Sequence, residues 1–225
     1  MTSAKTQLLP FVAAALLFAA AGAAGQDTKP PAQHASPAKA PVGDWRPMFD
    51  GKSLNGWKET PFTGHGSVRI ENETIVLGSG YMTGVNWTGK LPTSNYEIRL
   101  EASRIQGSDF FAGITFPVAD SFCTWINGGW GGQVVGLSSL NEMDASENQT
   151  SFTREFEKGR WYALRLRVTD RNISAWIDEE QVIDVELGEW TIGLRFGEIE
   201  LSKPFGIASY ETTARLRKIE YRLVQ

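Results

Sequence analysis

The sequence predicts an all-β domain in which two antiparallel sheets form a sandwich or jelly roll. Residues 96–102 alternate strictly between apolar and charged side chains, and residues 162–168 repeat this pattern. Such alternation is typical of antiparallel strands that bury one face. No segment after the first 43 residues shows a sustained helical period. Helices are therefore expected to be few and short.

The remaining strands are expected in chain order around these two. Residues 68–77 contain a hairpin that turns near Glu71, and residues 173–177 and 181–185 flank a second hairpin turn. Residues 214–223 form a closing strand, and a change of phase around Lys218 indicates a β-bulge. So many strands in one domain of this size favour a two-sheet sandwich or jelly roll.

Residues 1–25 have the features of a signal peptide. Lys5 gives a positive start, residues 8–21 form an apolar run, and small residues follow as a cleavage site. The run is shorter than the ~20 apolar residues that a spanning helix needs. We therefore expect a secreted or periplasmic protein that has no membrane span once the signal peptide is cleaved.

One folded domain is expected over residues 44–225. Residues 26–43 are rich in Pro, Ala, Gln and Lys, which predicts a disordered linker. The length that follows suits a single core. Cys123 is the only cysteine, so no disulfide within the chain is expected. We interpret Cys123 as a small buried hydrophobic residue.

The charged residues exclude some classes of function. The chain has 22 Lys and Arg against 26 Asp and Glu, which gives a formal net charge of −4. This mixed composition argues against nucleic acid as a partner. His65 is the only histidine in residues 44–225, which argues against a zinc site with several histidines. No cofactor is predicted, and a neutral or weakly charged ligand is favoured.

The tryptophans indicate a saccharide ligand. All eight lie in residues 44–225, and an indole face suits the C–H face of a sugar ring, although core packing is the alternative explanation. The glycine-rich run 125–132 contributes Trp125, Asn127 and Trp130 as candidates for saccharide binding. The alternative is a glycine-rich crossover whose tryptophans fill the core. Gln133 and Arg104 are further candidates, and Asp109 and Arg154 are polar residues near the same expected face.

Three acids follow in the sequence as Glu142, Asp144 and Glu147. Their spacing is similar to that of laminarinase-type glucanases, which use a pair of carboxylates about 5–5.5 Å apart. The similarity implies Glu142 as nucleophile, Glu147 as acid/base and Asp144 as the group that tunes their protonation. A solvated loop is an alternative, because Ala145 and Ser146 are poor strand formers. A Ca²⁺ site is another.

Residues 48–57 read MFDGKSLNGW. On physical grounds alone, the Asp-Gly and Asn-Gly pairs predict tight turns anchored by Phe49, Leu54 and Trp57. The run resembles the opening motif of the 3-keto-disaccharide hydrolase domain family, and the order of strands is similar over nearly the whole folded region. The resemblance implies a concanavalin-like sandwich in an exported hydrolase that acts on a glycosidic bond of an oxidised or ordinary saccharide. A non-catalytic carbohydrate-binding or interaction module of the same fold is the alternative.

Two further strand motifs of the family correspond to residues 112–117 and 133–138. The family's Arg, strand-initial Glu and terminal Asp would fall on Pro117, Gln133 and Ser138. Charged groups of the family pattern are therefore replaced here, and the sequence resembles a divergent branch.

Overall fold

The computed structural model describes residues 43–224, and these fold into two antiparallel sheets with two short 3-10 helices, η1 (Leu187–Glu189) and η2 (Glu198–Ser202). The predicted all-β sandwich is thus confirmed. The predicted signal peptide lies outside the described residues, as does the predicted linker apart from Gly43. Within residues 43–224, neither helix approaches the length and apolarity that a membrane span requires.

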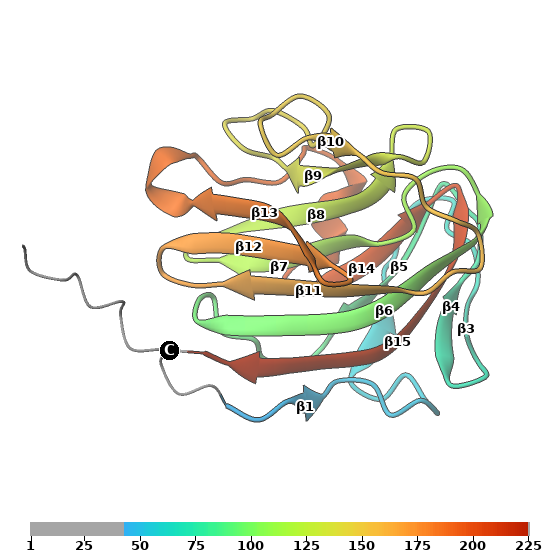
Figure 1. The fold of residues 1–225 in the computed structure, drawn as a ribbon. Coiled ribbons are helices and arrows are strands. Elements are labelled where there is room, and N and C mark those ends of the chain that lie inside the picture. The colour runs from blue at the N-terminus through green and yellow to red at the C-terminus, as the bar shows by residue number, and fades with distance from the viewer. Residues whose placement is uncertain (1–42, 225) are drawn as a thin grey trace, which may run out of the picture. The chain divides into compact units, whose positions relative to one another are not determined.

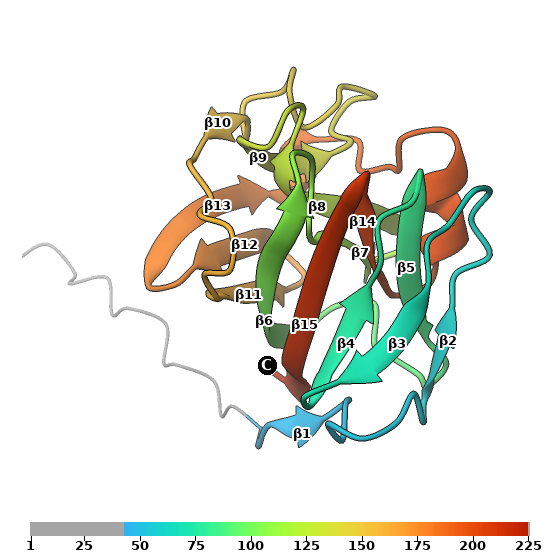
Figure 2. The same ribbon diagram turned by 90° about the vertical axis from the view of Figure 1, so that its right-hand side faces the viewer.

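The first sheet, called sheet A here, lies in front in Figure 1. Figure 2 shows its strands β6, β15, β4 and β3 side by side. Its order is β13 (Glu180–Glu186), β12 (Asn172–Ile177), β11 (Tyr162–Val168), β6 (Tyr96–Gly107), β15 (Thr212–Leu223), β4 (Thr74–Leu77) and β3 (Val68–Glu71), with β1 (Arg46–Pro47) beside β15.

The second sheet, sheet B, lies behind sheet A in Figure 1. Its order is β10 (Phe152–Thr153), β9 (Val134–Ser138), β8 (Ser121–Gly129), β7 (Gly113–Val118), β14 (Gly206–Tyr210), β5 (Met82–Trp87) and β2 (Trp57–Glu59). The core lies between the two sheets and is built from their inward side chains. The hydroxyl of Tyr96 in sheet A donates to the carbonyl of Pro117 in sheet B at 2.6 Å.

The strand predictions are confirmed in detail. The two alternating segments become β6 and β11, which pair with each other from Tyr96 opposite Val168 to Ala102 opposite Tyr162. The two predicted hairpins are β3–β4 and β12–β13. The register of β15 against β6 shifts between Arg217 and Glu220, and Lys218 there has a φ of +51°. That residue is the predicted bulge.

The MFDGKSLNGW run forms a turn whose residues Phe49 and Trp57 pack into the core. Asp50 accepts hydrogen bonds from the backbone N–H groups of Lys52 and Ser53 at 2.7 and 2.8 Å, which lowers the pKa of its carboxyl. The indole of Trp57 donates to the carbonyl of Met48 at 2.7 Å. Gly56 has a φ of +81°, and a Cβ there would lie 2.5 Å from the ring of Trp87. The motif is thus used for local structure.

The outer face of sheet A is covered by ion pairs. Glu97 of β6 is fully buried there, and the guanidinium groups of Arg165, Arg167 and Arg222 surround it. Arg165 contacts it at 3.2 Å and Arg167 at 2.5 Å. A buried carboxylate is stable only with such partners, because desolvation of an isolated charge is costly.

Replacement of Glu97 with Gln should lower the free energy of unfolding by about 2–4 kcal/mol, because a neutral amide leaves three neighbouring guanidinium groups without their counter-charge. Urea unfolding followed by tryptophan fluorescence measures the change. Glu179→Gln, an exposed change in the β12–β13 turn, should have an effect below about 0.5 kcal/mol. Equal effects of the two substitutions would contradict this role for Glu97.

Candidate functional site

A cavity of about 400 Å³ opens on the outer face of sheet B. The sheet contributes Met82 from β5, Thr124 and Ile126 from β8, Ser138 from β9 and Tyr210 from β14. The other walls come from residues next to strands and from the segment 195–199. The site therefore combines a rigid sheet floor with walls drawn from distant parts of the sequence.

Small residues let other segments approach this face of sheet B closely. A Cβ at Gly84 of β5 would lie 2.9 Å from the ring of Phe62, and a Cβ at Gly136 of β9 would lie 2.6 Å from the carbonyl oxygen of Ala145. The segments that carry Phe62 and Ala145 therefore fit only against glycine. They cover part of the face, and the cavity occupies the part between them.

Three aromatic rings form one wall of the cavity. Tyr81 and Tyr210 meet edge to face with centroids 5.1 Å apart, and Phe110 stacks on Tyr210 at 5.8 Å. Burial is the main cause that raises the pKa of Tyr210, and Glu211, Tyr81 and Asp109 also contribute. The phenol therefore stays neutral at ordinary pH and can donate a hydrogen bond.

Two more aromatic residues, Trp130 and Phe196, stand at the rim. The exposed fractions of Tyr81, Trp130 and Phe196 are 53%, 42% and 93%. Five large hydrophobic residues are exposed in residues 43–224, and these three all line this cavity. Aromatic side chains gathered around one opening indicate a binding surface rather than scattered exposure.

Two carboxylates line the cavity, and both already accept hydrogen bonds. Asp109 accepts from the backbone N–H of Phe110 at 2.8 Å and from that of Gly131 at 3.1 Å. Both oxygens of Glu198 accept from Thr63, one from its N–H at 2.8 Å and one from its hydroxyl at 3.0 Å. These bonds fix the orientation of each carboxylate, and each oxygen keeps a further lone pair for a ligand.

An ion pair lies at the edge of the cavity. Arg195 is the only cationic residue of the lining, and its guanidinium lies 3.3 Å from Asp144. The other oxygen of Asp144 accepts from the hydroxyl of Ser138 at 3.1 Å. This chain of contacts connects the predicted acidic run to the sheet floor through one residue, Asp144.

Of the predicted saccharide-binding residues, Trp130 lines the cavity, whereas Trp125 and Asn127 lie inside the sandwich. Both are fully buried on β8, and the Asn127 amide donates to the carbonyl of Ala112 at 3.0 Å. Their side chains share the parity of Cys123 and so point inward. The core-packing alternative is therefore the correct reading for Trp125.

Arg104 and Gln133 do not line the cavity either. Arg104 of β6 points into the core, where its guanidinium lies near the rings of Phe111 and Phe156 and donates to the Phe156 carbonyl at 2.9 Å. Burial lowers its pKa. Gln133 is exposed, and its amide donates to Glu155.

The acidic run 142–147 is a turn between β9 and β10, not a strand. Glu142 has a φ of +65° and is exposed. Glu147 is also exposed, and its carboxylate accepts from the backbone N–H of Asp144 at 3.3 Å. The strand geometry that a glucanase-like carboxylate pair needs is therefore missing, and the solvated-loop alternative describes Glu142 and Glu147. Among residues 43–224, no three His, Cys, Asp or Glu side chains are grouped so that they could hold a metal ion.

Sequence reasoning missed most of the cavity wall. Tyr81, Phe110 and Tyr210 each stand beside or at the end of a strand, where aromatic residues are common in any sandwich. The segment 195–199 carries Arg195, Phe196 and Glu198, but nothing in its composition sets it apart from an ordinary loop.

The comparisons with known proteins agree with the fold. Residues 44–222 match the model of the 3-keto-alpha-glucoside-1,2-lyase-like domain. A putative glycosyl hydrolase from Parabacteroides distasonis has a similar structure, with a TM-score of 0.53 and 12% identity over 81% of this chain and 94% of that one. No curated protein matches the sequence.

Two similar structures contain a saccharide. The Crh5 transglycosylase in complex with NAG gives a TM-score of 0.54 with 10% identity, over 83% of this chain and 88% of that one. Domain 4 of the arabinanase AbnA from Geobacillus stearothermophilus, in complex with arabinotriose, gives a TM-score of 0.51 with 12% identity, over 83% of this chain and 94% of that one. At these identities the similarity establishes the fold.

Cys123 is fully buried in β8, and burial raises the pKa of its thiol to about 12. Since the thiolate is the reactive form, a thiol reagent at pH 8 should label the native protein more than about a thousandfold more slowly than the urea-unfolded protein. Absorbance of the released chromophore of a disulfide reagent measures both rates. Rapid stoichiometric labelling of the native protein would instead show an accessible nucleophile.

Proposed function

The chain belongs to the 3-keto-alpha-glucoside-1,2-lyase-like domain family, and on this basis we propose that it binds an oxidised saccharide in the cavity of sheet B and hydrolyses its glycosidic bond. The single observation that carries the proposal is the cavity of about 400 Å³ with five aromatic side chains around it. That volume lies within the usual range for small-ligand sites, roughly 300–1,000 Å³. Aromatic walls suit sugar rings, and the polar residues between them suit hydroxyl groups.

The chemistry of a 3-keto sugar needs few catalytic groups. A carbonyl at C3 makes the proton on C2 acidic, so a base can remove it. The electron pair then forms a C1–C2 double bond as the C1–O bond breaks, and the leaving oxygen takes a proton. Addition of water to C1 and return of a proton to C2 complete a net hydrolysis. One base and one proton donor are therefore enough.

Asp109 and Tyr210 are the residues that we assign to these two tasks. Both line the cavity, and the carboxylate is close enough to contribute to the raised pKa of the phenol. Asp109, held by two backbone N–H groups, takes the C2 proton. Tyr210, neutral at ordinary pH, donates to the leaving oxygen. Trp130 and Phe196 close the rim over the sugar.

Export is part of the same proposal. The apolar run 8–21 after Lys5 supports secretion or transfer to a periplasm, where saccharides from outside the cell would reach the cavity. Cleavage after the small residues 21–25 would release the domain from the membrane.

One observation favours a second candidate function, carbohydrate binding without catalysis. Asp109 and Glu198, which line the cavity, accept hydrogen bonds from the protein itself on both oxygens, and Asp144 beside it accepts one from Ser138 and forms an ion pair with Arg195. Carboxylates engaged in this way can orient sugar hydroxyl groups, and fewer of their lone pairs remain free to take a proton. Only turnover separates the two functions.

Incubation of the protein with 3-keto-trehalose should release reducing sugar, and Asp109→Asn should lower the rate by about 10²–10⁴-fold because the amide cannot act as a base. Glu142→Gln and Glu147→Gln, exposed changes outside the cavity, should leave the rate unchanged. Reducing-end assays measure all four proteins. No release by the wild-type protein that still binds the sugar would favour the binding module. Loss of activity in the Glu142 or Glu147 variant would favour the acidic run instead.

Replacement of Trp130 with Ala should weaken binding of the same sugar about tenfold, because the sugar ring loses the indole on which it stacks at the rim. Titration calorimetry measures the dissociation constant, and each tryptophan variant is made in the Asp109→Asn protein so that the sugar is not turned over during the titration. Trp176→Ala removes an indole from the opposite sheet and should leave the dissociation constant unchanged. An equal loss in both variants would place the ligand elsewhere.

A further inference from the structure

The outer face of the three central strands of sheet A carries an excess of positive charge, although the whole chain has a net charge of −4. We call this surface the arginine face. Its outward charged residues on β6, β11 and β15 are the cations Arg99, Arg165, Arg167, Arg215, Arg217, Lys218 and Arg222 and the acids Glu97, Glu101 and Glu220.

Six of the seven cations of the arginine face are more exposed than its acids, and Arg222, at 21%, is the exception. The side chain of Glu97 is fully buried, and those of Glu101 and Glu220 are 23% and 25% exposed. Lys218 and Arg99, by contrast, are 65% and 46% exposed. The surface that an approaching molecule meets is therefore more positive than the count of residues suggests.

The guanidinium groups of this face keep unused hydrogen-bond donors. Each guanidinium has five N–H groups, and Arg165 and Arg167 contact Glu97 through one nitrogen each. Arg165 lies 3.7 Å above the ring of Trp176, and Arg217 lies 4.0 Å above that of Trp161. Stacking of this kind orients a guanidinium and leaves its edge free to bind an anion.

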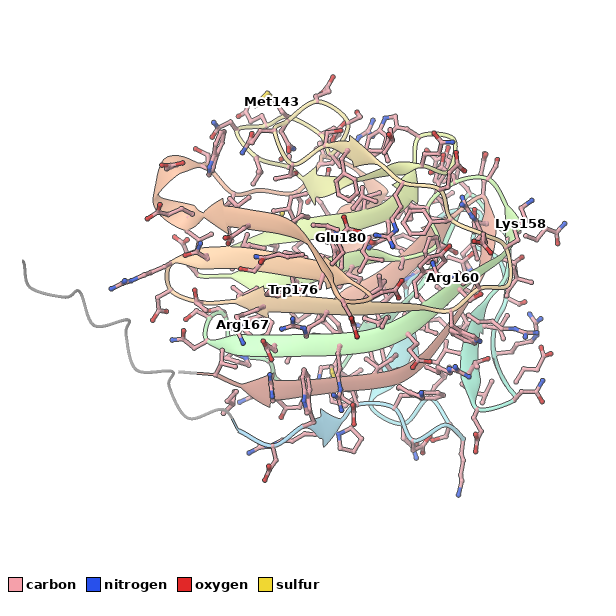
Figure 3. All side chains as sticks on the ribbon, viewed as in Figure 1. Met143, Lys158, Arg160, Arg167, Trp176 and Glu180 are labelled. Atoms are coloured by element: carbon pink, nitrogen blue, oxygen red, sulfur yellow. The ribbon has the colours of Figure 1, made fainter. Side chains whose placement is uncertain are left out.

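Three of the flanking acids are paired with cations. Glu71 is shared between Arg69 and Arg215, and Asp178 and Glu180 at the end of the face pair with Arg154 and Arg160. Asp184 of β13 accepts a hydrogen bond from the neutral hydroxyl of Ser174 and so keeps its negative charge beside the face. A groove of about 410 Å³ crosses the face. It is lined by the cations Arg99, Arg165 and Lys218 and by the acids Glu101, Asp178 and Glu220. Figure 3 shows Arg167 and Trp176 on the side of sheet A turned toward the viewer.

We propose that the arginine face binds an anionic polysaccharide, a sugar polymer with a carboxylate or sulfate on its repeating units. Outward side chains recur every ~6.6 Å along a strand and every ~4.8 Å across strands, so the cations form a flat array that a chain of regular negative charges can follow. Guanidinium edges pair with the acidic groups, and the indoles beneath them hold the guanidinium groups in place. The face belongs to sheet A, so the cavity of sheet B stays open while the polymer is bound.

Affinity electrophoresis in gels that contain polygalacturonate tests the proposal. At low salt the polymer should slow the protein, whereas uncharged dextran should not. The effect should vanish near 0.5 M NaCl, where screening shortens the reach of exposed charges to roughly 4 Å. The double variant Arg99→Gln/Lys218→Gln should bind about tenfold more weakly. Ala163→Glu, which places an acid on an exposed position of β11 in the groove, should weaken binding without the loss of any ion pair.

The matched control is Lys52→Gln/Lys158→Gln, which changes the net charge equally at two exposed positions outside the face. It should bind like the wild-type protein, and all variants should keep their thermal midpoints within a few degrees. Equal losses in both double variants would show a response to net charge alone and overturn the proposal. So would binding to anionic phospholipid vesicles or to DNA without binding to polygalacturonate.

Discussion

The burial of one side of every central strand is the constraint on which the rest of this structure depends. On β6, β11 and β15 the apolar residues point into the space between the sheets, and the charged residues point outward. A shift of one residue would exchange these sets, so the register is strongly fixed. The same alternation that builds the core therefore also gathers arginines on the outer face of sheet A, where Glu97 is held among three of them.

The outer face of sheet B differs from that of sheet A, because uncharged residues dominate it and other segments of the chain cover part of it. Glycines at 84 and 136 admit covering segments to within contact of the backbone. What those segments leave free becomes the cavity, and its rim carries the exposed aromatic residues of the domain. The two outer faces thus have unlike chemistry, aromatic and polar on one sheet and cationic on the other. One small sandwich can in this way offer two independent surfaces.

The strands and the bulge at Lys218 could be predicted from the sequence because their signal is local: a period of two, or a break in it. The cavity could not, because residues as far apart as 81, 130, 195 and 210 meet only in the folded chain. Trp125 and Trp130 show the difference. Both belong to one glycine-rich run. Trp125 lies on the inward side of β8 and is buried, whereas Trp130 follows a register shift between Asn127 and Gly129 and is exposed at the rim. Composition alone does not show which of the two indoles is buried and which is exposed. The total charge likewise indicates a mixed surface, because it does not show which charged residues of different strands lie on the same face of a sheet.

The walls of the cavity come largely from segments outside the strands of sheet B. Segments such as 195–199 form part of the opening, and within this segment only Ile199 packs against a hydrophobic cluster. Insertions or exchanges in these segments could retune which molecule is accepted while the folding free energy is hardly affected. Proteins with such a scaffold can thus change the ligand that they accept and still keep the same fold.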